Sequence, residues 1–219
     1  MVITLNGERK ELASSWKELS TKHFQLLVPE LAKPVADRDY FKIFQVLTDT
    51  QFDGYELTSE NEVTIWNAVK WIVEEPFQFS EELPKVLAVP HKGSTKIITL
   101  PKKIKALTIG QNINLKQVLE KSKYLDEKII DAVAIYLQPL IDEAKFNSDR
   151  VSEIKKDIEA MPVYLIRPIG FFLFKSVWPH GTGRVSYWKQ IKNSLTSKLG
   201  RTLPAWQRSA GSISIPILR

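Results

Sequence analysis

Apolar residues recur every three or four positions along most of the chain, which is the spacing of one face of an α-helix. Six stretches show this pattern, and each lies behind a polar residue that can accept hydrogen bonds from a first helical turn. The pattern therefore predicts a mainly helical protein. The expected apolar faces are Phe24, Leu27, Val28 and Leu31; Tyr40, Phe41, Phe44 and Leu47; Val63, Trp66, Val69, Ile72 and Val73; Leu115, Val118 and Leu119; Ile129, Ile130, Val133, Tyr136 and Leu137; and Val151, Ile154, Ile158 and Met161.

The ends of these helices are predicted from caps and prolines. The pairs Ser59–Glu62 and Thr108–Gln111 have the spacing of a capping box, in which each side chain bonds the other residue's backbone N–H. Proline lacks an N–H and clashes with the preceding turn, so Pro139 is expected to terminate or kink its helix. The expected caps are Ser20 or Thr21, Asp37, Ser59, Thr108, Asp126 and Asp149.

Two short segments are typical of β-strands. Val2 to Leu5 is followed by the turn pair Asn6-Gly7, and Lys96 to Leu100 is rich in β-branched residues. We expect these two segments to pair as one small two-stranded β element. Residues 76–95 contain three prolines and are interpreted as a connection between subdomains.

Charge divides the chain unevenly. The last acidic residue is Glu159, and residues 160–219 hold nine basic residues and no acidic one. The first 159 residues hold 22 basic and 25 acidic residues, a net charge of −3. We therefore expect a mainly α, helical globular domain over residues 1–180 and a basic, aromatic-containing C-terminal extension over residues 181–219.

Sequence motifs for chemistry are scarce. The chain has no cysteine, which excludes disulfides, thiol nucleophiles and cysteine metal sites and fits a reducing compartment. His23, His91 and His180 lie far apart, and the loops at Gly93 and Gly181 lack the spacing of a phosphate-binding loop. The apolar run from Val163 to Trp178 is too short and too charged to span a bilayer. We expect no catalytic, cofactor-binding or metal site, and no membrane span.

The C-terminal quarter offers the strongest candidate binding residues, because it interleaves aromatic and basic side chains. Such a mixture suits a protein interface, where Trp, Tyr and Arg dominate binding energy, and it also suits nucleic acid. A solvated basic face is the third alternative. Further on, the alternation from Ile213 to Leu218 suits addition of an extended strand to a partner's sheet edge. The candidate partner-binding residues are Trp178, Arg184, Tyr187, Trp188, Lys189, Lys192, Arg201, Trp206 and Arg208.

Residues 100–175 also carry a family resemblance. The stretch from Leu100 through Leu107-Thr108-Ile109-Gly110-Gln111, the segment from Ala132 to Pro139, and the run from Pro168 to Phe174 occur in this order. That order resembles a group of tailed-bacteriophage and prophage proteins encoded among virion and tail or baseplate assembly genes.

The resemblance implies a structural or assembly component of a phage tail or baseplate that acts through protein–protein contacts, without an active site. Its partners would be other virion or assembly proteins with an acidic surface, and it would be oligomeric within the assembly. It would work in the host cytoplasm during assembly, or in the virion. The alternative is a nucleic-acid-binding accessory protein that uses the basic C-terminal quarter.

Overall fold

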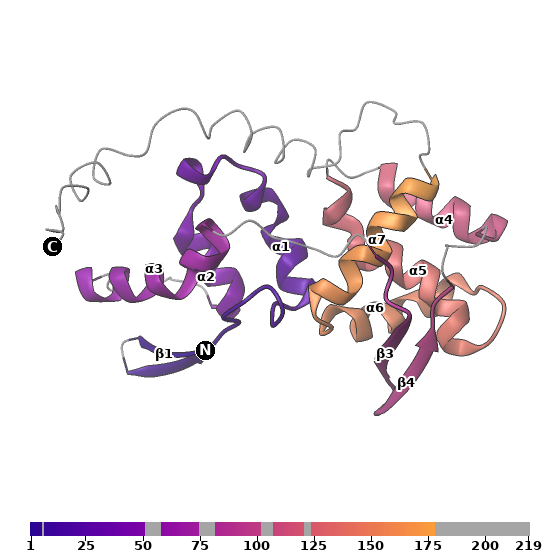
Figure 1. The fold of residues 1–219 in the computed structure, drawn as a ribbon, viewed down its shortest axis with the longest axis horizontal. Helices are drawn as coiled ribbons and strands as arrows, with labels where there is room; N and C mark the ends of the chain where they lie inside the picture. Colours follow the sequence, from indigo (N-terminus) through magenta and orange to yellow (C-terminus); the bar gives the residue numbers. More distant parts are fainter. Residues whose placement is uncertain (6, 51–57, 75–81, 102–106, 121–123, 178–219) are drawn as a thin grey trace, which may run out of the picture.

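The structure, a computed structural model, describes residues 1–5, 7–50, 58–74, 82–101, 107–120 and 124–177. Within these ranges the chain forms seven α-helices and two antiparallel hairpins, so the predicted mainly helical fold is confirmed (Figure 1). The elements are β1 (Val2–Leu5), β2 (Glu8–Glu11), α1 (Thr21–Leu31), η1 (Val35–Asp37), α2 (Tyr40–Thr48), α3 (Ser59–Glu74), β3 (Val86–His91), β4 (Ser94–Thr99), α4 (Ile109–Glu120), η2 (Leu125–Lys128), α5 (Ile129–Asp142), η3 (Ser148–Arg150), α6 (Val151–Glu159) and α7 (Val163–Val177).

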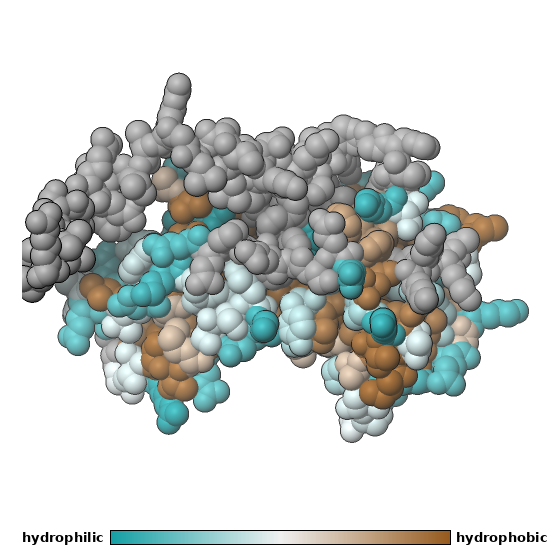
Figure 2. Space-filling view, viewed as in Figure 1, coloured by the Kyte–Doolittle hydropathy of each residue, from teal (hydrophilic) through white to brown (hydrophobic). Residues whose placement is uncertain are grey.

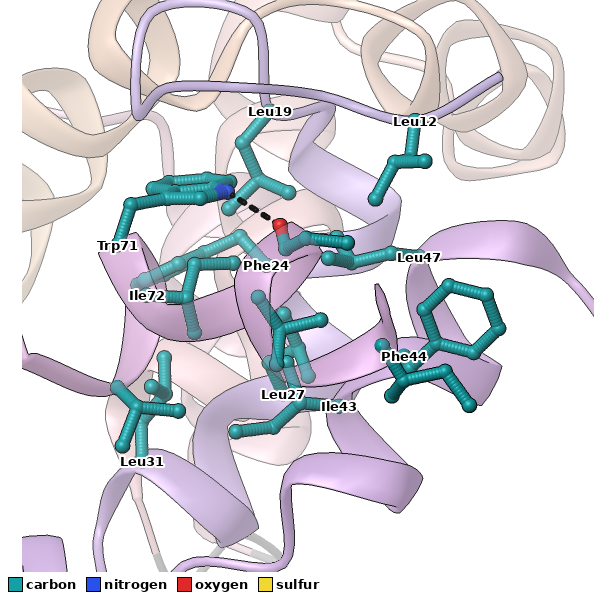
Figure 3. Packing of buried hydrophobic residues seen from close by; sticks show 14 of the residues in the cluster. Leu12, Leu19, Phe24, Leu27, Leu31, Ile43, Phe44, Leu47, Trp71 and Ile72 are labelled. Atoms are coloured by element: carbon teal, nitrogen blue, oxygen red, sulfur yellow. Dashed lines mark hydrogen bonds between the residues drawn. The ribbon is translucent and has the colours of Figure 1, made fainter. Parts of the chain in front are cut away.

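Helices α1, α2 and α3 pack around one hydrophobic cluster beside the β1–β2 hairpin. Phe24, Leu27 and Ile43 are fully buried there, and the Trp71 indole N–H donates to the Ala68 carbonyl oxygen at 3.1 Å (Figure 3). The guanidinium of Arg38 donates to the backbone oxygens of Leu31 and Val73, at the C-terminal ends of α1 and α3. These bonds satisfy carbonyls that a helix end leaves without an internal partner.

Helices α4 to α7 and the β3–β4 hairpin build the other half of the molecule. Helix α5 is its central element, and ten of its fourteen residues are buried. Helix α7 passes closely over the start of α5, because Gly170 leaves no Cβ to collide with the Ile129 side chain. A two-stranded hairpin alone is marginally stable, so packing on the helices is what holds β3 and β4 in place.

A short polar joint connects the two halves. Thr21 donates both its N–H (2.8 Å) and its hydroxyl (2.7 Å) to the Met161 oxygen, and the Val163 N–H donates to the Leu19 oxygen at 2.8 Å. The Gln25 side chain accepts from the Ile130 N–H, so α1 also caps the start of α5. Because Val163 belongs to the first hydrophobic cluster, the two halves pack as one body.

Several local predictions are wrong, and each has a physical reason. Two caps are confirmed: Ser20 accepts from the His23 N–H, and Thr108 and Gln111 form their capping box. Helix α5 continues through Pro139 to Asp142 and ends at Glu143, whose φ of 53° is left-handed. The predicted caps Asp37, Ser59, Asp126 and Asp149 are replaced: Asp39, Thr58 and Asn147 cap their neighbouring turns, and Asp126 makes a buried ion pair instead.

The predicted strand pairing is also wrong. Val2–Leu5 pairs with the polar strand β2, and β4 pairs with β3, which lies inside the stretch interpreted as a connection. In both cases only two residues separate the paired strands in sequence, and such local pairing closes a much smaller loop than the predicted long-range one. Among the predicted apolar faces, Val63 is the clear exception, since 59% of it is exposed.

Within the described ranges, no helix combines the length and apolar character needed to cross a bilayer. The run that begins at Val163 forms α7, and it folds against α5 as part of the core.

Candidate protein-binding surface

The nine partner-binding residues predicted from sequence, Trp178 to Arg208, all lie outside the described residues, as does the whole expected extension over residues 181–219. The arrangement of the described residues points to a different surface, the β3–β4 hairpin. Sequence analysis did not single it out.

The hairpin is closed by a two-residue turn. Lys92 and Gly93 both have positive φ, 50° and 76°, which is the geometry of a type I′ turn. The loop at Gly93, which lacks the spacing of a phosphate-binding loop, thus forms a tight hairpin turn. Because successive side chains of a strand point to opposite faces, the hairpin has an inner face toward the helices and an outer face toward solvent. The tip of the hairpin extends past the helices at the lower edge of Figure 1.

The inner face packs on the helices. Leu87, Val89 and Ile98 are buried, at most 5% exposed, in the cluster formed by α5, α6 and α7. Burial of these three side chains contributes roughly 1.5–3 kcal/mol each to holding the hairpin against the body.

Charged side chains anchor the same inner face. His91 Nδ1 lies 2.7 Å from Asp157 Oδ2 on α6, and His91 Nε2 lies 3.9 Å from Asp142 Oδ1 at the end of α5. Arg150 Nη2 approaches the same Asp142 oxygen at 2.9 Å. Lys96 of β4 pairs with Glu143 at 3.1 Å and also donates to the Ile141 oxygen. The hairpin is thus fixed to two helices by ion pairs as well as by apolar packing.

A histidine between carboxylates also occurs in catalytic sites, so the chemistry of this group needs examination. In a catalytic dyad one ring nitrogen faces a carboxylate and the other faces a nucleophile or substrate. Here both nitrogens of His91 face carboxylates, and Asp142 is itself held by Arg150 and by the Gln138 amide at 2.8 Å. The geometry is that of a structural anchor. His91 is the last residue of β3, and its side chain is only 12% exposed.

The outer face carries no charge. All six of its residues are exposed, and each is apolar or a threonine: Val86, Ala88 and Pro90 on β3, and Thr95, Ile97 and Thr99 on β4. Ile97 is 64% exposed and Val86 is 53% exposed. Figure 2 shows hydrophobic surface over the hairpin at the lower right. Solvent-facing strands usually carry charges that discourage contact, so an uncharged outer face is typical of a binding surface.

The two outer edges of the hairpin differ. The Leu100 N–H donates to the Lys85 oxygen, so these two residues form a hydrogen-bonded pair. Along an antiparallel ladder such pairs alternate with pairs whose backbone groups point outward. With the observed register, the backbone groups of Thr95, Ile97 and Thr99 therefore point away from β3, along the outer edge of β4. On β3 the equivalent positions include Pro90, which has no N–H to donate. Among the described residues neither edge pairs with another strand, and only that of β4 offers a donor at every outward position.

Other polar groups of the described residues serve the fold. A surface hollow beside the β1–β2 hairpin includes Glu18, whose pKa is lowered by hydrogen bonds from the Ser14 N–H and hydroxyl. His23 borders the same hollow and pairs with Asp49 at 3.2 Å. In the part of the chain that the structure describes, no three His, Asp or Glu side chains are grouped to hold a metal ion.

Sequence reasoning missed this surface because residues 76–95, which include β3, were interpreted as a connection, and because the contacts that anchor the hairpin join residues far apart along the chain. His91 and Asp157 are 66 residues apart, and β3 lies among prolines. The available signal was the short apolar run from Val86 to Pro90, which ends near the glycine of the Lys92-Gly93 turn and is consistent with a strand. Comparison of the chain with protein-family models, with curated proteins and with solved structures returns no match.

Proposed function

We propose that the protein is a non-enzymatic assembly component that acts through protein–protein contacts, and that the β3–β4 hairpin is its contact surface. The observation that carries this proposal is the uncharged outer face, on which Ile97 is 64% exposed. Beside it, the outer edge of β4 has backbone N–H and carbonyl groups that point away from β3. An exposed strand edge with adjacent apolar side chains is the surface used in β-augmentation, where a partner adds a strand.

The anchoring of the hairpin supports this role. Binding by a mobile segment loses the entropy of ordering that segment, whereas a surface that is already fixed avoids most of that cost. The contact of His91 with Asp157, the ion pair of Lys96 with Glu143, and the buried Leu87, Val89 and Ile98 hold the outer face in one orientation before any partner arrives.

The proposed setting is the assembly of a phage tail or baseplate, in the host cytoplasm or in the virion. Its support is the resemblance of residues 100–175, most of which form α4 to α7. The basic residues after Glu159 favour partners with an acidic surface, because opposite charge speeds encounter and fixes orientation.

The test is site-specific photo-crosslinking in cells that make the protein and its natural partners. A photoreactive amino acid replaces Ile97, and in a matched control it replaces Val63, which is similarly exposed (59%) but lies on α3. We expect a discrete protein adduct from position 97 and none from position 63. Adducts of equal yield from both positions, or none from position 97, would contradict the proposal.

A further inference from the structure

We propose that the outer edge of β4 pairs with the β4 edge of a second copy of this chain, in an antiparallel, two-fold arrangement. This inference rests on the proposed function, since it names the partner of the same surface. The pairing would join two hairpins into one four-stranded sheet. Sheets of three or more strands are much more stable than a lone hairpin.

The choice of edge follows from backbone donors. Thr95, Ile97 and Thr99 each direct one N–H and one carbonyl outward, so all three positions of β4 can exchange both bonds with a facing strand. Pro90 interrupts the same ladder on β3, and proline is a device by which sheet edges avoid pairing. Four of the six residues of β4 are β-branched, which suits an added ladder.

The choice of a second copy follows from self-complementarity and charge. With Ile97 on the two-fold axis, Thr95 lies opposite Thr99 of the second copy, and the isoleucines face each other. No charged side chain stands on the outer face, and Lys96, the charged residue of β4, points inward to Glu143. A two-fold contact requires one patch to match itself, and this strand meets that condition.

The neighbouring registers are each disfavoured. If the two-fold axis moves one residue toward the hairpin tip, Lys96 lies opposite Lys96 of the second copy. Like charges directly opposite each other destabilise a strand pair. A shift the other way sets Thr95 against Pro101, which has no N–H. Only the register centred on Ile97 uses every outward donor and acceptor of β4, so the sequence specifies one alignment.

The experiment is sedimentation velocity of the purified full-length chain over a concentration series. The parent is expected to form dimers as concentration rises. Ile97→Lys should weaken dimerisation at least about tenfold, because it places two ammonium groups at the axis. Thr95→Pro should weaken it as well, since Thr95 faces Pro90 and its N–H takes no part in the hairpin's own ladder. Val86→Lys is the control and should leave the dimer unchanged, because Val86 is also exposed on the outer face (53%) but lies on β3.

A chain that stays monomeric, or a dimer that survives both Ile97→Lys and Thr95→Pro, overturns the inference. A dimer lost equally in Val86→Lys overturns it too, because that result indicates a general effect of charge. Failure here is distinguishable from failure of the proposed function. A monomer that still gives a photo-adduct with a different protein at position 97 contradicts only the two-fold pairing. In that case the edge of β4 accepts a strand from another chain.

Discussion

The buried ion pair between Asp126 and Arg167 offers the sharpest test of how η2 is held against α7 within the second half of the molecule. Asp126 lies in η2, on which α1 packs, and Arg167 lies on α7, 41 residues later. Arg167 Nε is 2.7 Å from one carboxylate oxygen and Nη2 is 3.3 Å from the other, and both side chains are 4% exposed. The perturbation is Arg167→Met, which keeps an apolar stem of similar length and removes the charge.

The magnitude follows from the burial. Removing one member of a buried pair leaves the other charge without compensation in a medium that solvates it poorly, at a cost of about 3–5 kcal/mol. Replacing both members, as Asp126→Asn with Arg167→Met, should cost less than Arg167→Met alone, because no net charge remains buried. Small domains have total stabilities of about 5–15 kcal/mol, so the single change is large enough to measure readily.

Urea unfolding followed by circular dichroism supplies the assay, with the midpoint and the slope fitted separately. Arg9→Met on the exposed strand β2 is the control and should stay within about 0.5 kcal/mol of the parent. If Arg167→Met unfolds at the same midpoint as the parent, the pair does not hold η2 against α7. A double variant that is less stable than Arg167→Met alone would likewise show that the single variant leaves no uncompensated buried charge.

Three further predictions concern the core, the hairpin anchor and acid stability. Val133 is fully buried on α5, so Val133→Asp should cost several kcal/mol, on the order of ~3–5 for an uncompensated buried charge, and a melt like the parent's would contradict its placement. His91→Ala should speed amide exchange throughout β3 and β4 while leaving α3 unchanged, and uniform exchange in both would argue against an anchor. Hydrogen bonds from Lys22 and then His23 lower the pKa of Asp49, so its stabilisation is present above the unfolded value near pH 4 and is lost as pH falls through the folded value. Asp49→Asn should therefore cost at most about 1 kcal/mol at pH 7, since the group is exposed, and the difference from the parent should vanish in acid.

Most of the helices were predictable because their buried residues recur in the sequence with the period of an α-helix. The faces around Phe24 and Val133 were read directly from spacing, and Thr108 with Gln111 formed the expected capping box. These features depend only on residues within one or two turns of each other. Helix α7 has no one-sided apolar pattern in the sequence, because it is buried on most sides. Arg167 and Pro168 also interrupt its apolar run.

The features that the sequence did not predict depend on partners far along the chain, or on which of several partners a side chain takes. Asp126 can cap a helix, but a guanidinium 41 residues away takes its carboxylate instead. Pro139 was expected to terminate or kink α5; the helix does not end there but runs on to Asp142, and the Ala144 N–H donates back to the Pro139 oxygen to close its last turn. The polar sequence of β2 gave no alternation of apolar residues, so its pairing follows from the turn at Gly7 alone. The candidate hairpin is local in sequence, but the contacts that anchor its inner face, such as His91 with Asp157, join residues far apart along the chain.

Residue-resolved amide hydrogen exchange along β4, compared between the dilute chain and the assembled chain, reports directly whether the outer edge of β4 is the contact surface. Thr95, Ile97 and Thr99 direct their N–H groups outward, whereas Lys96 and Ile98 donate to β3. Exchange reports whether each N–H has a hydrogen-bond partner, so the two sets provide an internal comparison within one strand.

If the outer edge of β4 is the contact surface, the amides of Thr95, Ile97 and Thr99 exchange rapidly in the dilute chain. They should then slow by at least about tenfold on assembly, which corresponds to about 1.4 kcal/mol of added protection. Lys96 and Ile98 should be slow in both states. Assembly that leaves the three outward amides as fast as in the dilute chain would contradict the account, because it would show that the contacts form elsewhere.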